Sequence, residues 1–128
     1  MTLWTPAGDT VGSGLESVFV GTFTISSGAA LSNQQWPLGL HLAGIQVPAG
    51  WTTAAITLLA TMDNVTWQGV NDNNASEVTI QATAGRYTEI PPGLLGKLLG
   101  VQFRSGTTAT PVNQASTVVL QAFFTPYR

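Results

Sequence analysis

Residues that could do acid–base or metal chemistry are few in this chain, and their spacing assembles no recognisable site. His41 is the single histidine, and it stands between two leucines. A general base or a metal ligand needs partners of suitable type nearby, and no pattern supplies them for His41. The six carboxylates are isolated in sequence, so a glycosidase pair would have to converge from distant segments. The sequence therefore predicts no catalytic residues, no metal site and no cofactor.

One polar segment, 71–74, offers the oxygen ligands that calcium prefers. Asp72 lies there among three asparagines, but the alternating acidic spacing of a dedicated calcium loop is absent. Asp and Asn side chains also stabilise turns by hydrogen-bonding the nearby backbone. We interpret the segment as a polar turn.

A second segment, 61–67, looks like a degenerate relative of the Asp box, a hairpin motif common in sialidases. It is one residue short of that motif and lacks its glycine. The Asp box is itself structural, so even a true match would not imply hydrolysis. The chain also lacks a Gly-rich phosphate loop, a Gly-x-Ser-x-Gly elbow and a His-Glu-x-x-His motif. Neither the degenerate Asp box nor the absence of these catalytic motifs points to an enzyme.

The four tryptophans are the candidates for binding. Tryptophan stacks on sugars and is also enriched in protein interfaces. Trp51 and Trp67 are expected in the core of a hairpin, whereas Trp4 follows Leu3 in an otherwise polar N-terminal arm. Leu3, Trp4 and Trp36, which precedes a proline, are therefore the predicted interface residues.

The elements that must position these residues are short strands, because turn residues interrupt the chain about every ten positions. We expect strands at 18–25, 40–47, 51–61, 65–70, 77–82, 86–90, 100–105 and 117–124. Asp63 and Asn64 are expected to form the turn of the hairpin between the third and fourth of these strands. The segment 86–90 is expected to pair with 77–82.

These elements predict an all-β protein, an antiparallel β-sandwich of about eight strands with a jelly-roll-like topology. Residues 1–16 are expected to form an extended arm, and residues 17–128 a single domain.

Charge is unusually sparse. Only 8% of the residues are Asp, Glu, Lys or Arg, where a soluble domain has about 25%. The four basic residues are scattered and the net charge is −2, which argues against nucleic acid as a partner. The N-terminus lacks the pattern of a signal peptide, and no segment has the apolar length of a membrane span. Such a surface suits a subunit packed against copies of itself, or a monomer with a Thr- and Asn-rich exterior.

Several short motifs occur in an order that resembles a known group of proteins. They lie at 42–45, 48–52, 63–67, 104–107 and 111–114. Together they resemble small structural proteins encoded near the head genes of tailed bacteriophages and gene transfer agents. The likeness covers roughly residues 28–124, with Asp-Asn in the hairpin where Asp-Gly is expected.

The resemblance implies a virion component on the capsid exterior: a decoration, cement or spike-base protein, plausibly a homotrimer. It would bind the major capsid protein and its own copies, with Leu3 and Trp4 of the arm as anchors. The alternative is a glycan-binding module of a head fibre or tail spike. A solvent-exposed pair chosen from Trp36, Tyr87 and Trp4 would favour that alternative.

Overall fold

Within residues 18–38, 40–91 and 99–126, which the computed structural model describes, every named element is a strand. Eight strands form one sheet in the order β5-β4-β7-β2-β1-β8-β3-β6, and all neighbouring pairs are antiparallel. The strands are β1 (Phe19–Ile25), β2 (Leu31–Gln35), β3 (His41–Gln46), β4 (Ile56–Thr61), β5 (Gln68–Gly69), β6 (Tyr87–Glu89), β7 (Gly100–Ser105) and β8 (Val118–Thr125). The prediction of an all-β protein with about eight antiparallel strands is confirmed. No helix in the described part of the chain is long and apolar enough to cross a membrane.

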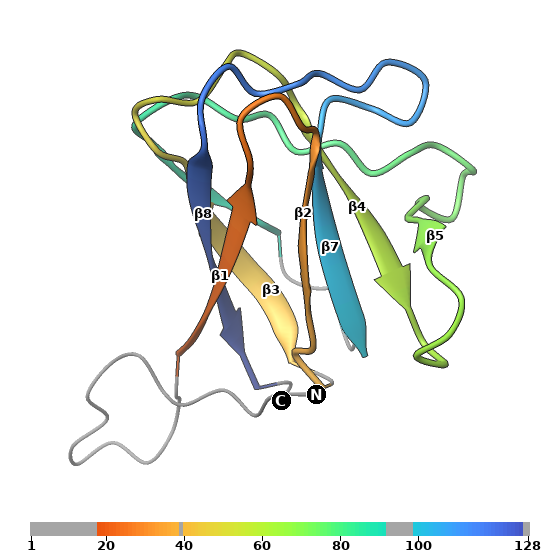
Figure 1. Ribbon diagram of the computed structural model, residues 1–128. Coiled ribbons are helices and arrows are strands. Elements are labelled where there is room, and N and C mark those ends of the chain that lie inside the picture. Colours follow the sequence, from red (N-terminus) through yellow and green to blue (C-terminus); the bar gives the residue numbers. More distant parts are fainter. Residues whose placement is uncertain (1–17, 39, 92–98, 127–128) are drawn as a thin grey trace, which may run out of the picture.

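The sheet curls so that its two halves face each other across the core (Figure 1). Strands β8, β1 and β3 form one half, and β7, β4 and β5 the other. Phe23 of β1 and Phe103 of β7 are fully buried, and their ring centroids are 4.4 Å apart. Alternate residues of β8, from Val118 to Phe124, point into the same core. Each such buried apolar side chain contributes about 1.5–3 kcal/mol to folding.

Side-chain amides replace part of the backbone ladder where the two halves meet, between β1 and β2. The register there holds one Cα pair, Ile25 with Ser32. The side chain of Asn33 accepts the Thr24 N–H at 2.7 Å, and Gln35 donates to a carbonyl of β1 at 2.9 Å. Because so few backbone pairs join β1 to β2, the sheet can bend between these two strands. Sequence reasoning missed β2 because Leu-Ser-Asn-Gln-Gln shows no apolar alternation.

Three strand predictions need correction. The strand expected at 51–61 begins at Ile56, and the one expected at 65–70 is reduced to the two residues of β5. The segment 77–82 makes only isolated antiparallel bridges, Glu77 with Asn71 and Ile80 with Ile56. Strand β6 pairs with β3 and not with 77–82. The predicted arm, residues 1–16, lies outside the described residues, and so do Leu3 and Trp4.

A buried glutamine ties together the loops at one end of the sheet. Gln114 has 0% exposure. Its side-chain oxygen accepts the Thr52 N–H at 2.7 Å, and its Nε2 donates to the Thr52 carbonyl at 3.1 Å and to the Ser105 hydroxyl at 2.8 Å. A buried amide with satisfied hydrogen bonds fixes loop positions that apolar packing alone would leave undetermined.

Candidate functional site

The carboxylate of Asp63 is part of the hairpin turn. Its Oδ1 accepts the N–H groups of Thr66 at 2.7 Å and Val65 at 2.8 Å. These two backbone hydrogen bonds, that of Thr66 first, lower the pKa of Asp63 to about 2. Asn64 has a φ of 64°, the left-handed conformation that asparagine tolerates. The predicted turn is thus confirmed, and a carboxyl that is ionised at neutral pH is no proton donor.

The predicted polar turn around Asp72 is also present. Asp72 Oδ1 accepts the N–H groups of Asn74 at 2.8 Å and Ser76 at 3.1 Å. Among the residues that the structure describes, no three His, Cys, Asp or Glu side chains gather as a metal site would require. The geometry therefore assigns Asp72 to the backbone of its own loop.

A carboxylate and a guanidinium tie the same long loop to the outer side of β4 and β7. Arg104 Nη1 lies 3.3 Å from Glu77 Oε2 and donates to Thr108 Oγ1 at 2.7 Å. Both backbone and hydroxyl of Thr108 donate to the Glu77 carboxylate. Glu77 is therefore held by a structural network.

His41, for which the sequence predicted no site, and Trp36, a predicted interface residue, are both engaged within the fold. His41 Nε2 lies 2.6 Å from Thr125 Oγ1 at the end where β3 begins. Trp36 is half-buried, meets Trp67 edge-on at 6.2 Å, and donates its Nε1–H to Asn64 at 2.8 Å. Trp36 thus supports the hairpin, and an interface role for it stays a prediction. Trp51 is buried in the core, as expected.

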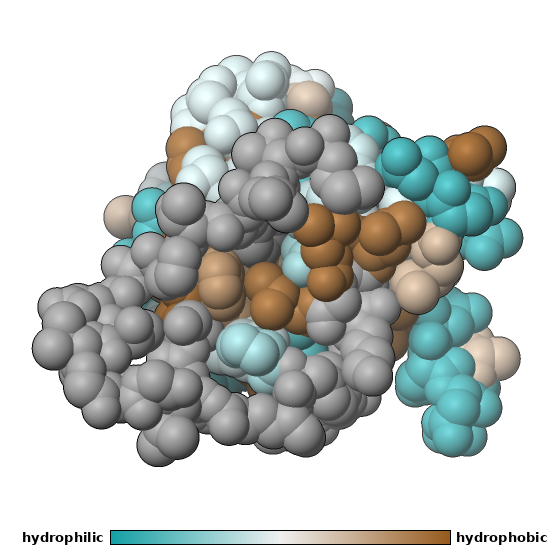
Figure 2. All heavy atoms as spheres, turned by 90° about the horizontal axis from the view of Figure 1, so that it is seen from below, coloured by the Kyte–Doolittle hydropathy of each residue, from teal (hydrophilic) through white to brown (hydrophobic). Residues whose placement is uncertain are grey.

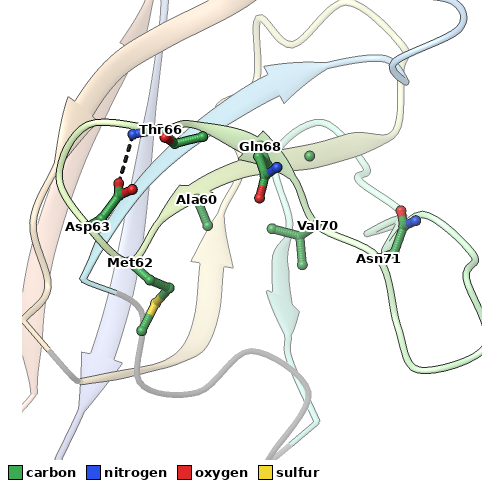
Figure 3. Close-up of a pocket in the computed structure, with 8 residues that line it drawn as sticks. Ala60, Met62, Asp63, Thr66, Gln68, Val70 and Asn71 are labelled. Carbon is green, nitrogen blue, oxygen red and sulfur yellow. Dashed lines mark hydrogen bonds between the residues drawn. The ribbon is translucent and has the colours of Figure 1, made fainter.

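A hollow of about 500 Å³ lies beside strands β4 and β5 at the edge of the sheet (Figure 3). The close-up shows Met62 and Asp63 at one end and Asn71 at the other, with Gln68 and Val70 between them. Its lining consists of Ala60, Met62, Asp63, Thr66, Gln68, Gly69, Val70 and Asn71. No aromatic side chain belongs to this lining, so the hollow has no surface on which a planar or sugar ring could stack.

A different surface gathers amides around an exposed aromatic ring. On the outer side of the β6-β3-β8-β1 half, Tyr87 lies opposite Gln46, Gln46 opposite Gln121, and Gln121 opposite Thr22. Paired residues of antiparallel strands project from the same side of a sheet, and all four are exposed. We call this surface the amide face, and it comprises Thr22, Gln46, Pro48, Tyr87, Val119, Gln121 and Phe123.

The ring of Tyr87 reaches over strand β3. Its hydroxyl end sits directly over Gly44, where any side chain would collide with it. The ring meets Phe123 edge-on at 5.7 Å, and the residue keeps 53% of its surface exposed. Partial burial raises the pKa of Tyr87, and the negative charge of Glu89 adds to that shift. The phenol is therefore uncharged at neutral pH, and its ring is held in place and partly exposed. We call this ring the Tyr87 plate.

A smaller hollow continues the amide face next to this plate. It measures about 210 Å³ and is lined by Gln46, Pro48, Val119 and Gln121. Within the described part of the chain, no hydrogen bond engages the side-chain amides of Gln46 and Gln121. Sequence reasoning named Tyr87 but missed both glutamines, since only the strand register places them beside it.

Comparisons with known proteins identify no family for this chain. No protein-family model matches the chain, and no curated protein matches it. A solved structure, CBM32-1 from a family 31 glycoside hydrolase from Clostridium perfringens, is similar with a TM-score of 0.47 and 12% identity. That match covers 97% of this chain and 91% of the other. The proposals below rest on the chain's own surface chemistry.

Proposed function

We propose that this chain is a non-catalytic binding module whose amide face binds carbohydrate. One observation carries the proposal: the hydroxyl end of the Tyr87 ring lies over Gly44, and the residue is exposed beside the unengaged amides of Gln46 and Gln121. An aromatic face stacks on the C–H groups of a sugar ring, and amides both donate to and accept from its hydroxyls.

The charge of this surface restricts the ligand. The amide face contains neither lysine nor arginine, and Glu89, opposite Gly44, is exposed at its border. Phosphates and anionic sugars need cationic partners, which this surface does not supply. A neutral glycan therefore fits the face better than an anionic one.

The proposal is tested by affinity electrophoresis in gels that contain neutral polysaccharides. The chain should be retarded, and Tyr87→Ala should remove the retardation because it deletes the aromatic plate. Val65→Ala is the matched control, since it trims an exposed apolar side chain at the hairpin tip. Retardation that survives Tyr87→Ala would overturn the site, and a chain retarded by no polysaccharide would overturn the function.

A second candidate function is the virion subunit that the sequence resemblance implies, on the capsid exterior and bound to the major capsid protein and to copies of itself. It is favoured by exposed apolar residues near one end of the molecule, where β1 begins and β4 ends. Met62 and Val65 of the hairpin are 68% and 81% exposed, and Val18 and Leu38 are exposed as well. Figure 2 looks onto this end and shows hydrophobic residues among the hydrophilic ones.

Light scattering tests the self-association that this second candidate requires. A stable trimer, near three times 13.4 kDa, that dissociates in a Met62→Ser and Val65→Ser double variant would support it. A monomer at all concentrations would contradict the trimer.

A further inference from the structure

The amide face holds two adjacent features, the Tyr87 plate and the small hollow, and their order along the strands suggests an extended ligand. Phe123, Gln121 and Val119 are successive outward residues of β8. Phe123 supports the plate, and the other two line the hollow. The rise per residue in a strand places the Cα atoms of Val119 and Phe123 about 13 Å apart.

From this arrangement we propose that the site binds a neutral oligosaccharide chain along β3 and β8, with one sugar on Tyr87 and the next units in the hollow beside Gln121. The inference rests on the proposed carbohydrate-binding function and adds the ligand's length and direction.

The lining of the hollow fits the inner units of such a chain. The amides of Gln46 and Gln121 face each other across β3 and β8 and offer donors and acceptors for hydroxyls on both sides. Pro48 and Val119 supply apolar surface, and Val119 is 41% exposed. A sugar ring has both an apolar side and a hydroxyl rim, so it can satisfy both kinds of partner.

Two other polar features of the described surface fit a sugar chain less well than the amide face does. The larger hollow beside β4 and β5 has no aromatic side chain in its lining, and Oδ1 of Asp63 is bonded to the backbone of its own turn. On the outer side of β4 and β7, Arg104 is occupied by Glu77 and Thr108. The observations converge on the amide face.

The test begins with the full chain on an array of neutral oligosaccharides that runs from single sugars to hexasaccharides. The best series is then titrated by calorimetry into wild type, Tyr87→Ala and Gln121→Ala, with Gln102→Ala as a matched control. Gln102 is a half-buried amide whose side chain donates to the Ser32 carbonyl on the other half of the sheet. Circular dichroism checks that each variant is folded.

We expect the longer members to bind at least tenfold more tightly than the single sugar. Gln121→Ala should remove most of that gain, whereas Tyr87→Ala should abolish binding at every length. If oligosaccharides of all lengths bind with equal affinity, and Tyr87→Ala binds none of them, the extended site is overturned and the proposed function is kept. Binding of no array member would overturn both.

Discussion

The two outer sides of the curled sheet use their polar side chains in opposite ways. Over β4 and β7, Arg104 is bonded to Thr57, Glu77 and Thr108. Over β3 and β8, the amides of Gln46 and Gln121 have no hydrogen-bond partner from the described chain. The polar side chains over β4 and β7 therefore stabilise the fold, whereas those over β3 and β8 are available to bind a ligand.

A polar group that is bonded internally contributes to stability, and its loss leaves a partner unsatisfied. A polar group that is exposed and unengaged contributes little to stability. Substitutions should therefore separate the two surfaces by their effects on unfolding and on binding.

The largest effect on stability is expected at Gln114. This residue is a glutamine like Gln46 and Gln121, but its side-chain amide is hydrogen-bonded within the fold. Gln114→Leu keeps the volume but leaves the backbone of Thr52 and the hydroxyl of Ser105 without their partner. The free energy of unfolding should fall by about 3 kcal/mol, since each buried unsatisfied group costs about 1–3 kcal/mol. Urea unfolding followed by tryptophan fluorescence measures this, and a loss below about 1 kcal/mol would contradict the assignment.

Glu77→Gln should have the next largest effect. It removes the counter-charge of Arg104, whose side chain is only 11% exposed. We expect the free energy of unfolding to fall by about 1–2 kcal/mol, because the 23% exposed Glu77 side chain is partly screened by water. Glu89→Gln, at an exposed carboxylate, is the control and should change it by less than about 0.5 kcal/mol. Equal effects in the two variants would refute a special role for the Glu77 pair.

Asp63→Asn should alter how stability depends on pH. The folded-state pKa of Asp63 is about 2, below the ordinary value of 3.8, so ionisation of this group favours the folded state. Its contribution is fully present above about pH 4 and disappears as the pH falls toward 2. Thermal unfolding between pH 2 and 6 should therefore show a smaller acid-induced loss in the variant. Identical pH profiles for the two proteins would contradict the turn assignment.

The smallest effect on stability is expected on the amide face. Gln46→Ala and Gln121→Ala should each change the free energy of unfolding by less than about 0.5 kcal/mol, since their amides bond no described residue. The same variants should weaken oligosaccharide binding about tenfold, as calorimetry would show. A loss of stability above about 1 kcal/mol would mean that these side chains serve the fold.

The hydrophobic pattern of the sequence predicted some strand positions correctly and others not. The segment 100–105 alternates Val101 and Phe103 with polar residues and forms β7 at those residues. The segment 77–82 alternates as well, yet it makes only isolated bridges and its Glu77 pairs with Arg104, so tertiary contacts override its strand tendency.

The candidate site was far less accessible to sequence reasoning. Tyr87, Gln46 and Gln121 come from three distant segments, and only the register of β6, β3 and β8 puts them in one row. Pairing between distant strands depends on the whole fold, and a shift of one residue would turn each side chain to the opposite face. The expected pairing of 86–90 with 77–82 was wrong, so the row could not be foreseen.

The most direct test of the amide face is a nuclear magnetic resonance titration of the isotopically labelled chain with a neutral oligosaccharide identified on the array. The account predicts that backbone shifts concentrate at residues 44–48, 87–89 and 119–123, with little change around Arg104 and Glu77. Shifts confined to residues 60–71, beside the larger hollow, would contradict it.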